Sequence, residues 1–373
     1  MTKRQIGRRE FVREGSAIVA AAAATGSAVG ADAAEVDTKK IVNYNPKMRY
    51  RRLGKTNLMV SEVSLGGHWK NRGGGRYWGD FSNDEVPDDV GKNRADVVST
   101  CVDCGINYLD ITTSAECCAY GVALKGRREK MYVGADDYRI CPRQKQNCNV
   151  KSLTGSVEGC MRRLQTDYLD IWRPQMDMGG RNTDDEVKVV IETFQKLREA
   201  GKVRHLGMSN HHRDWTKYVI EKFPEFEMFI FPCTAKTKEK DKPVSKENVT
   251  GGDSAHSVFE AIRQNNVGLV TIKPYSGGSL FKTPAKFPVV GVGSKEENDL
   301  ARLTLQCILT NDAITAAVPG LTTVYEVENA ARASYERPVA MTPREREWLA
   351  KMVDEHWKQL PKEYQWLRDW EVV

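Results

Sequence analysis

Eight short apolar segments alternate along this chain with eight segments that show helical periodicity. A short apolar run bounded by Gly or Pro is typical of a buried strand, whereas apolar residues recurring every third or fourth position indicate an amphipathic helix. The expected strands are Val60–Leu65, Asn107–Ile111, Met131–Ala135, Leu169–Arg173, Val203–Met208, Glu227–Pro232, Gly268–Ile272 and Ile314–Pro319. The expected helices are residues 92–104, 116–126, 151–164, 184–200, 213–222, 253–264, 296–309 and 323–334. This regular alternation predicts an α/β fold, a (β/α)8 TIM barrel.

A doubly wound open sheet is the alternative fold. It would carry the fingerprint G-x-G-x-x-G after its first strand. The turn after Leu65 reads GGHWKNRGGG, which lacks that fingerprint. The 373 residues are compatible with one barrel that carries loop insertions. We therefore expect one barrel over residues 48–335, opening with an N-terminal hairpin.

Three stretches lie outside the regular pattern. Asn71–Asn93 is rich in Gly, Asp and Asn, and the lysine-rich Lys236–Ser254 reads as a solvated loop, so both are expected to be insertions. Residues 336–373 contain a periodic helix at 343–358 and an aromatic tail with Tyr364, Trp366 and Trp370. These aromatic side chains are too apolar to remain in water, so the tail is expected to cover one end of the barrel or to form a partner surface.

Residues 1–34 have the features of a signal peptide. Arg8 and Arg9 precede a weakly apolar, Ala-rich run that ends in an A-x-A site at Ala31–Ala33. Paired arginines with this weak hydrophobicity favour the twin-arginine export machinery and a periplasmic or other extracytoplasmic location. An ordinary or uncleaved leader is the alternative. Residues 35–47 are expected to link the leader to the barrel. No later run is long enough to span a membrane.

Charge and cysteine content narrow the function classes. The formal net charge of +6 is modest for this length and predicts no nucleic-acid partner. Cys101 and Cys104 have metal-type spacing but fall in a helical pattern, and a second CxxC is missing, so no metal centre is predicted. Cys141 and Cys148, in a polar loop, are the pair we expect to form a disulfide.

Several segments carry a family resemblance. LREAGKVRHLGMSN resembles the fifth-strand signature of the aldo-keto reductases, and GINYLD, ending at Asp110, is similar to the family's second strand. RYRRLGKTNLMVSEVSLGG resembles the opening hairpin and first strand, while ALKGRREKMYVG and TDYLDIW resemble the third and fourth strands. KPYSGGSLF and VPGLTTVYEVENAARA are similar to the seventh-strand turn and the last cofactor-binding helix. The landmarks follow family order over residues 48–334.

This resemblance implies an oxidoreductase that binds NADP or NAD and acts on a small carbonyl or alcohol substrate. The implied cofactor-binding residues are Ser209, Asn210, Lys273, Pro274, Gly277, Gly278, Leu280, Gly320, Thr322, Glu328 and Asn329. Glycines allow close backbone approach to a pyrophosphate, and a hydroxyl and an amide at a strand end suit a nicotinamide carboxamide. The last loop lacks a basic residue suited to a 2′-phosphate, which leaves the choice between NADP and NAD open.

The catalytic positions depart from the family pattern. The family uses an aspartate, a tyrosine, a lysine and a histidine, with the tyrosine donating the proton. Only the aspartate, Asp110, matches, because Ala115 stands at the tyrosine position, Asp136 at the lysine position and Gln175 at the histidine position. Tyr120 is a further candidate donor, although ALKGRR follows it so closely that packing on a helix is the alternative.

Three function classes remain open at this point. The first is an oxidoreductase with another proton donor: Tyr120, Glu116, His68 or His211. The second is a non-redox enzyme in which Asp110, Asp136, Asp137 and the two histidines hold a metal or perform carboxylate acid/base chemistry. The third is a binding barrel without catalysis. We favour the first, because the cofactor landmarks persist better than the catalytic ones.

Overall fold

The computed structural model describes residues 37–69, 84–237, 257–281, 294–337 and 339–371. The predicted leader and most of both predicted insertions lie outside these residues. The chain divides into two units, Met1–Lys40 and Ile41–Val373. In the first, the described part forms a short 3-10 helix, η1 (Thr38–Lys40). The second unit contains the barrel, and part of the predicted linker belongs to it, since Asn43 donates to the Val102 carbonyl at 2.9 Å.

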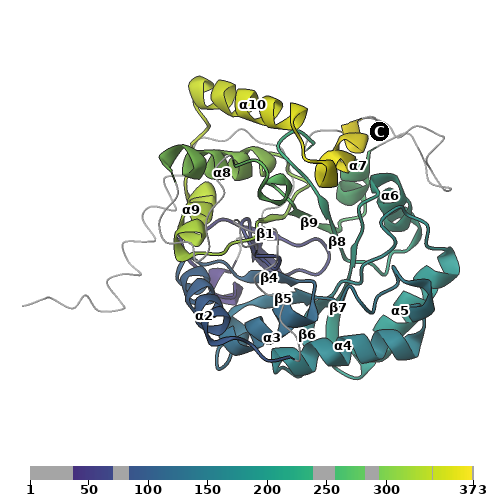
Figure 1. Cartoon of the computed structure of the whole chain (residues 1–373). Coiled ribbons are helices and arrows are strands. Elements are labelled where there is room, and N and C mark those ends of the chain that lie inside the picture. The colour runs from purple at the N-terminus through teal and green to yellow at the C-terminus, as the bar shows by residue number, and fades with distance from the viewer. Residues whose placement is uncertain (1–36, 70–83, 238–256, 282–293, 338, 372–373) are drawn as a thin grey trace, which may run out of the picture. The chain divides into compact units, whose positions relative to one another are not determined.

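Eight parallel strands form the barrel (Figure 1). In chain order they are β3 (Leu65–Gly66), β4 (Tyr108–Ile111), β5 (Tyr132–Ala135), β6 (Leu169–Trp172), β7 (Val203–Ser209), β8 (Met228–Pro232), β9 (Gly268–Ile272) and β10 (Ala316–Val318). Each strand pairs with the next one in the sequence. The ring closes where Ser64 N donates to Ala317 O at 3.0 Å and Ala317 N donates to Glu62 O at 2.8 Å. The predicted TIM barrel is confirmed.

Helices surround this ring (Figure 1). They are α2 (Asp88–Asp103), α3 (Ser114–Ala123), α4 (Val150–Leu164), α5 (Asp184–Glu199), α6 (Arg213–Lys222), α7 (Val258–Gln264), α8 (Lys295–Ile308), α9 (Val324–Tyr335) and α10 (Pro343–Lys358). Side-chain capping explains where several of these helices begin. Thr113, Thr183 and Thr323, for example, each accept from a backbone amide three residues on, and a Glu at that position returns the bond. In the described part of the chain, no helix is both long and apolar enough to cross a membrane.

The expected first strand, Val60–Leu65, is in fact divided between two structures. Val60 lies in the hairpin of β1 (Tyr50–Arg52) and β2 (Met59–Ser61), and Leu65 begins β3. Between them Glu62 is fully buried and pairs with three arginines, Arg51 at 2.7 Å, Arg337 at 2.8 Å and Arg49 at 3.5 Å. This ion cluster interrupts the strand because a buried carboxylate must be paired where it lies.

The hairpin closes the N-terminal end of the barrel. Leu53, which follows β1, is fully buried in the apolar cluster inside the barrel together with Val60, Tyr108 and Met228. A side chain at Gly268, where β9 begins, would collide with Leu53, so this strand accepts only glycine there. With this end filled by apolar atoms, polar chemistry is confined to the carboxyl ends of the strands.

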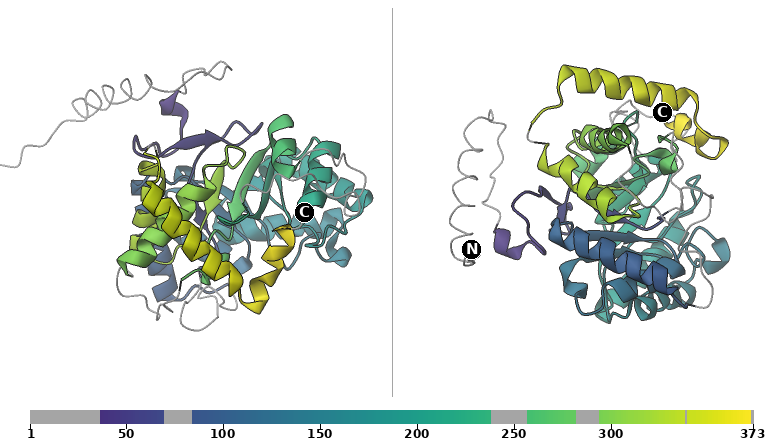
Figure 2. Two further views of the ribbon diagram at one scale, coloured as in Figure 1. Left: turned by 90° about the horizontal axis from the view of Figure 1, so that it is seen from above. Right: turned by 60° about the vertical axis from the view of Figure 1, so that its left-hand side comes forward.

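The C-terminal region packs beside α8 (Figure 2). Leu349 and Val353 of α10 join Leu300 and Leu303 of α8 in one apolar cluster. A 3-10 segment, η6 (Lys362–Glu371), follows α10, and we call it the tail. It carries Tyr364 and Trp366, whereas the side chain of Trp370 lies outside the described atoms.

Candidate functional site

A cavity of about 470 Å³ opens at the carboxyl ends of the barrel strands. The cavity is lined by nine of the residues that the sequence predicted for the site: Asp110, Gln175, Ser209, Lys273, Pro274, Gly277, Gly278, Gly320 and Thr322. Six others are not among its lining residues: Asp136, Tyr120, Asn210, Leu280, Glu328 and Asn329. The fold thus brings residues of the expected nicotinamide, pyrophosphate and adenosine regions to one cavity.

Asp110 is paired with an arginine that the sequence analysis did not assign to the site. Arg173 directly follows β6, and its Nε and Nη2 donate to the two carboxylate oxygens of Asp110 at 2.5 and 2.8 Å. Burial raises the pKa of Asp110 and Arg173 opposes that rise. Burial disfavours the charge of Arg173, but Asp110 outweighs it and raises the arginine pKa. The sequence signal that could have placed Arg173 in the site is its position at the end of the expected strand Leu169–Arg173.

Asp136 and Gln175 form a second buried pair. Gln175 N donates to Asp136 Oδ2 at 2.9 Å, and Trp172 Nε1 lies 3.4 Å from Oδ1. Burial raises the pKa of Asp136 to about 7, against the lowering effects of Arg173 and of the Gln175 amide. Asp136 therefore lies behind the cavity wall, and the Gln175 side chain lies in it.

His68 and Glu116 form a dyad in the cavity wall. His68 Nδ1 lies 2.7 Å from Glu116 Oε1, and Thr112 Oγ1 lies 3.1 Å from the same ring nitrogen. His68 has a left-handed backbone with φ of 56°, which its amide supports by donating to Glu116 Oε1 at 2.6 Å. Burial would raise the pKa of Glu116, but His68 and neighbouring amides hold it below its usual range. Glu116 is therefore a carboxylate that orients the imidazole.

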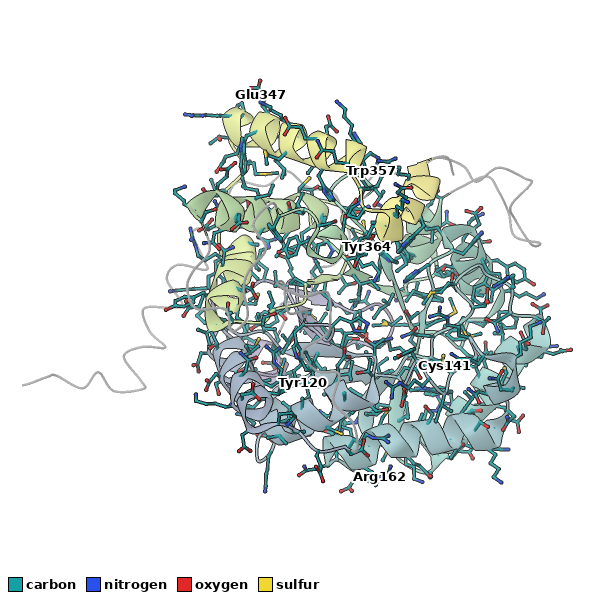
Figure 3. All side chains as sticks on the ribbon, viewed as in Figure 1. Tyr120, Cys141, Arg162, Glu347, Trp357 and Tyr364 are labelled. Carbon is teal, nitrogen blue, oxygen red and sulfur yellow. The ribbon has the colours of Figure 1, made fainter. Side chains whose placement is uncertain are left out.

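Tyr120 lies in the core. Its side chain has no exposed surface, its hydroxyl donates to Gly66 O at 2.8 Å, and Trp69 packs edge-on against its ring. Burial raises the pKa of its phenol above the usual value. The geometry therefore does not suit the proton-donor role considered for Tyr120, because its hydroxyl is bonded to the backbone and is absent from the cavity wall. Figure 3 labels it on α3, away from the tail.

The tail covers part of the cavity. Trp366 stacks on His211 with ring centroids 4.7 Å apart and an interplanar angle of 8°. Burial, together with Lys273 and Arg143, lowers the pKa of His211 to about 3. Tyr364 lies on the side of the tail that faces the barrel (Figure 3) and lines the cavity. His211 is therefore a neutral, stacked ring.

The loop after β9 has the backbone expected of a phosphate cradle. Lys273, Ser276, Gly277 and Gly278 all have positive φ, and η5 (Ser276–Gly278) is part of this loop. A Cβ at Gly277 would overlap the Tyr364 hydroxyl, whereas one at Gly278 would meet no atom within 4 Å. The open space at Gly278 is suited to a phosphate that approaches the backbone.

Four expected cofactor residues have other contacts. Asn210 is fully buried, and its side chain donates to Asp177 O at 2.6 Å and accepts from His212 N at 2.6 Å. It therefore shapes the loop before α6, whose N-cap is His212. Leu280 packs in the apolar cluster under α10. Glu328 is exposed on α9, and Asn329 donates to Asn298 O at 2.8 Å.

The amides that begin α9 are already bonded. Thr322 N and Thr323 N donate to Glu326 Oε2 at 2.6 and 3.2 Å. Thr322 is one of the residues that the family resemblance assigns to the cofactor. A carboxylate now lies where that anion would bind, so the start of α9 favours a neutral or cationic neighbour.

The expected disulfide between Cys141 and Cys148 is not formed. Both are free thiols, and the Cys141 sulfur contacts Tyr138 O at 3.2 Å whereas the Cys148 sulfur contacts Glu186 O at 3.5 Å. Cys141 thus contacts its own loop, whereas Cys148 contacts the first turn of α5. Among the described residues, no group of three or more His, Cys, Asp or Glu side chains is arranged to hold a metal ion.

Comparison with known proteins agrees with this geometry. The model of the aldo/keto reductase family matches residues 78–339. L-galactose dehydrogenase of Arabidopsis thaliana is 25% identical over 307 residues, covering 76% of this chain and 86% of that protein. A holo aldo-keto reductase from Bacillus halodurans superposes with a TM-score of 0.56 at 21% identity, over 82% of this chain and 96% of that chain. A Klebsiella pneumoniae aldo/keto reductase in complex with NADP and acetate gives a TM-score of 0.56 at 15% identity, over 82% of this chain and 95% of that chain. Because the family model spans more than half of the chain, this protein is an oxidoreductase that belongs to the aldo/keto reductase family.

Proposed function

We propose that this protein transfers a hydride between NAD(P) and a small carbonyl or alcohol substrate, and that His68 exchanges the proton with the substrate oxygen. The observation that carries the proposal is the His68–Glu116 dyad, joined at 2.7 Å in the cavity wall. An ionised carboxylate on one ring nitrogen fixes the imidazole and attracts its positive charge. This arrangement matches the general rule for an oriented histidine acid/base.

The alternative donors are weaker on the same geometry. Tyr120 is buried and bonded to a carbonyl oxygen. His211 is stacked under Trp366, and its pKa of about 3 makes it a poor proton carrier near neutral pH. Glu116 has a lowered pKa and is therefore deprotonated at neutral pH. His68 combines a place in the cavity wall with a charge-stabilising partner.

The residues around the cavity fit a dinucleotide. Ser209 and Gln175 lie side by side at the ends of neighbouring strands, and the Gly278 backbone lies open nearby in the same cavity wall. Relatives solved with NADP or NADPH support this assignment. When bound, the nicotinamide supplies or accepts the hydride.

The chain's own residues then manage the proton and the charge. In the reducing direction, protonated His68 donates its proton through Nε2 to the oxygen of the carbonyl as hydride reaches the carbon, which yields an alcohol and neutral imidazole. Glu116 holds Nδ1 throughout. Asp110 and Arg173 neutralise each other and place a fixed ion pair beside the reacting groups. Oxidation of an alcohol reverses these steps.

The test is to compare the wild-type chain with His68→Asn for nucleotide binding and for turnover. Quenching of tryptophan fluorescence by NADPH and NADH measures binding, and absorbance of the reduced nicotinamide measures turnover with a panel of aldehydes and ketones. We expect binding in both proteins and a fall in kcat of about 10²- to 10⁴-fold in the variant, the usual size of a lost general acid.

His205→Asn is the matched control. His205 also pairs with a carboxylate, Glu227, at 3.1 Å, but it does not line the cavity. It should keep its kcat. Retained turnover in His68→Asn would refute the assignment of the proton donor. Saturable nucleotide binding without turnover of any carbonyl or alcohol would instead indicate a binding barrel.

We also propose that residues 1–34 direct export through the twin-arginine route. Arg8, Arg9 and the A-x-A site at Ala31–Ala33 support it. A reporter fused after residue 47 should reach the periplasm, and replacing both arginines by lysine should retain it in the cytoplasm. Export that continues through the general secretory route in the lysine variant would contradict this proposal.

A further inference from the structure

The ionisable side chains of the cavity wall are predominantly basic. Four cations line it, Arg139, Arg143, Arg173 and Lys273, against two carboxylates, Asp110 and Glu116. Both carboxylates are already paired inside the wall, Asp110 with Arg173 and Glu116 with His68. The cations of the wall therefore outnumber its carboxylates, and a narrow cleft lined mainly by one sign of charge concentrates ions of the opposite sign.

Arg143 is the cation whose position is most informative. Its backbone amide donates to Gln175 O at 3.0 Å, so it sits beside the residue at the family's histidine position. Within the described residues, its guanidinium makes no hydrogen bond or ion pair, in contrast to that of Arg173, and the side chain is exposed. A guanidinium offers a planar fork of donors that fits a carboxylate or a phosphate.

The loop that carries Arg143 is held in place by short contacts. Gln144 Nε2 donates to Tyr138 O at 3.0 Å, and Asn182 Nδ2 donates to Pro142 O at 3.1 Å. Cys141, two residues before the arginine, has no exposed surface. A fixed backbone confines the reach of the Arg143 side chain to this part of the cavity wall, which limits the entropy lost when it binds a ligand.

Arg143 also lies at the reacting end of the cavity. Gln175 is bridged to Ser209, the residue implied in nicotinamide binding, whereas the glycines of the phosphate cradle belong to the loop after β9. Lys273, in that second loop, is the cation that the family resemblance assigns to the cofactor. The charge of Arg143 is therefore surplus to what the cofactor needs.

We propose that Arg143, assisted by the charge of Arg139, determines specificity by binding an anionic group of the substrate, a carboxylate or a phosphate, remote from the reacting carbon. This inference rests on the proposed oxidoreductase function and deepens it. The substrate class is then an acidic aldehyde, ketone or alcohol, such as a sugar acid, a semialdehyde acid or a phosphorylated aldehyde.

Matched pairs of small molecules test this proposal without knowledge of the natural substrate. The pairs are glucuronate and glucose, succinic semialdehyde and butanal, 4-carboxybenzaldehyde and benzaldehyde, and glyceraldehyde 3-phosphate and glyceraldehyde. Calorimetry measures the affinity of each for the full chain, with and without NADP, and turnover is recorded separately. The last pair distinguishes a phosphate from a carboxylate.

We expect the anionic member of at least one pair to bind about tenfold more tightly, the size of one charge-assisted hydrogen-bonded contact. Arg143→Met should abolish that preference and leave the neutral members unchanged. Arg198→Met, which removes a surface arginine of α5 over Phe194, is the control and should keep the preference.

Three results would overturn the proposal. They are equal binding of both members in every pair, a preference that survives in Arg143→Met, and a loss of NADPH affinity in that variant, which would assign the arginine to the cofactor instead. Failure of the proposed function has a different signature. In that case the anionic probes still bind through Arg143, but no carbonyl or alcohol is turned over.

Discussion

Arg173 of the segment after β6 grips Asp110 of β4 with two hydrogen bonds of 2.5 and 2.8 Å, and the same guanidinium reaches Ile111 O at 2.5 Å. Both side chains are almost completely buried. Asp110 is therefore neutralised by Arg173, which directly follows β6.

Replacing Arg173 alone should destabilise the fold more than replacing both Arg173 and Asp110. Arg173→Met leaves a buried carboxylate without its partner, and we expect the free energy of unfolding to fall by about 3–5 kcal/mol. In Arg173→Met with Asp110→Asn, much of that loss should be recovered because no charge is left buried. Urea unfolding of the two single variants and the double variant measures the coupling, and additive effects would show that the pair does not interact as the geometry indicates.

Asp136 should make stability depend on pH. Its pKa is raised to about 7 by burial, above the usual 3.8, so the folded state holds the proton more tightly than the unfolded chain. The contribution of Asp136 to the free energy of unfolding is then greatest at low pH, and it is lost as the pH rises from 3.8 to about 7. Asp136→Asn should remove this loss and, relative to wild type, gain a few kcal/mol between pH 5 and pH 8.

Asp312→Asn is a control with the opposite sign for that experiment. The Arg263 hydrogen bond lowers the pKa of Asp312, an exposed carboxylate, so its small contribution is present at neutral pH and lost towards acid. Chemical denaturation of both variants from about pH 2.5 to pH 8 provides the comparison, because the Asp312 contribution is lost only below its unfolded pKa of 3.8. If the difference in free energy of unfolding between Asp136→Asn and wild type did not change with pH, the raised pKa of Asp136 would be contradicted.

The tail should control the solvation of His211. Trp366→Ala removes the stacked ring, so water can reach the imidazole and its pKa should rise from about 3 towards its ordinary range. Histidine NMR titration measures this shift, with His211→Gln identifying the signal. Trp348→Ala, which trims an aromatic residue packed on the α8 cluster, should leave it unchanged. A His211 signal that titrates identically in all three proteins would show that the tail does not shield it.

The start of α9 should disfavour an additional phosphate. Glu326 occupies the amides of Thr322 and Thr323, so a 2′-phosphate placed there would meet a carboxylate. We expect NADH to bind more tightly than NADPH, and Glu326→Ser to narrow the difference. Fluorescence titration with both nucleotides checks this. Tighter binding of NADPH by the wild-type chain would show that the phosphate lies elsewhere.

Much of the fold was accessible from the sequence because its signals are local. Apolar runs and helical periodicity placed seven of the eight barrel strands and the helices near their observed bounds, and polar caps such as Thr113 and Thr323 explain where helices begin. The exception is Val60–Leu65, where pairing of buried Glu62 with Arg51 and Arg337 interrupts the strand. Those arginines lie far from each other in the sequence, so no local pattern reveals the cluster.

For the site, too, some features follow from the sequence and others from the tertiary structure. The sequence alone determined the barrel and the family, because these follow from residue identity and spacing. Only the tertiary structure decided that Arg173 neutralises Asp110, that Glu116 orients His68, and that the tail stacks on His211. Each of these contacts joins residues from different elements. Closure of the barrel sets their distances, and burial then sets the charge that each group can carry.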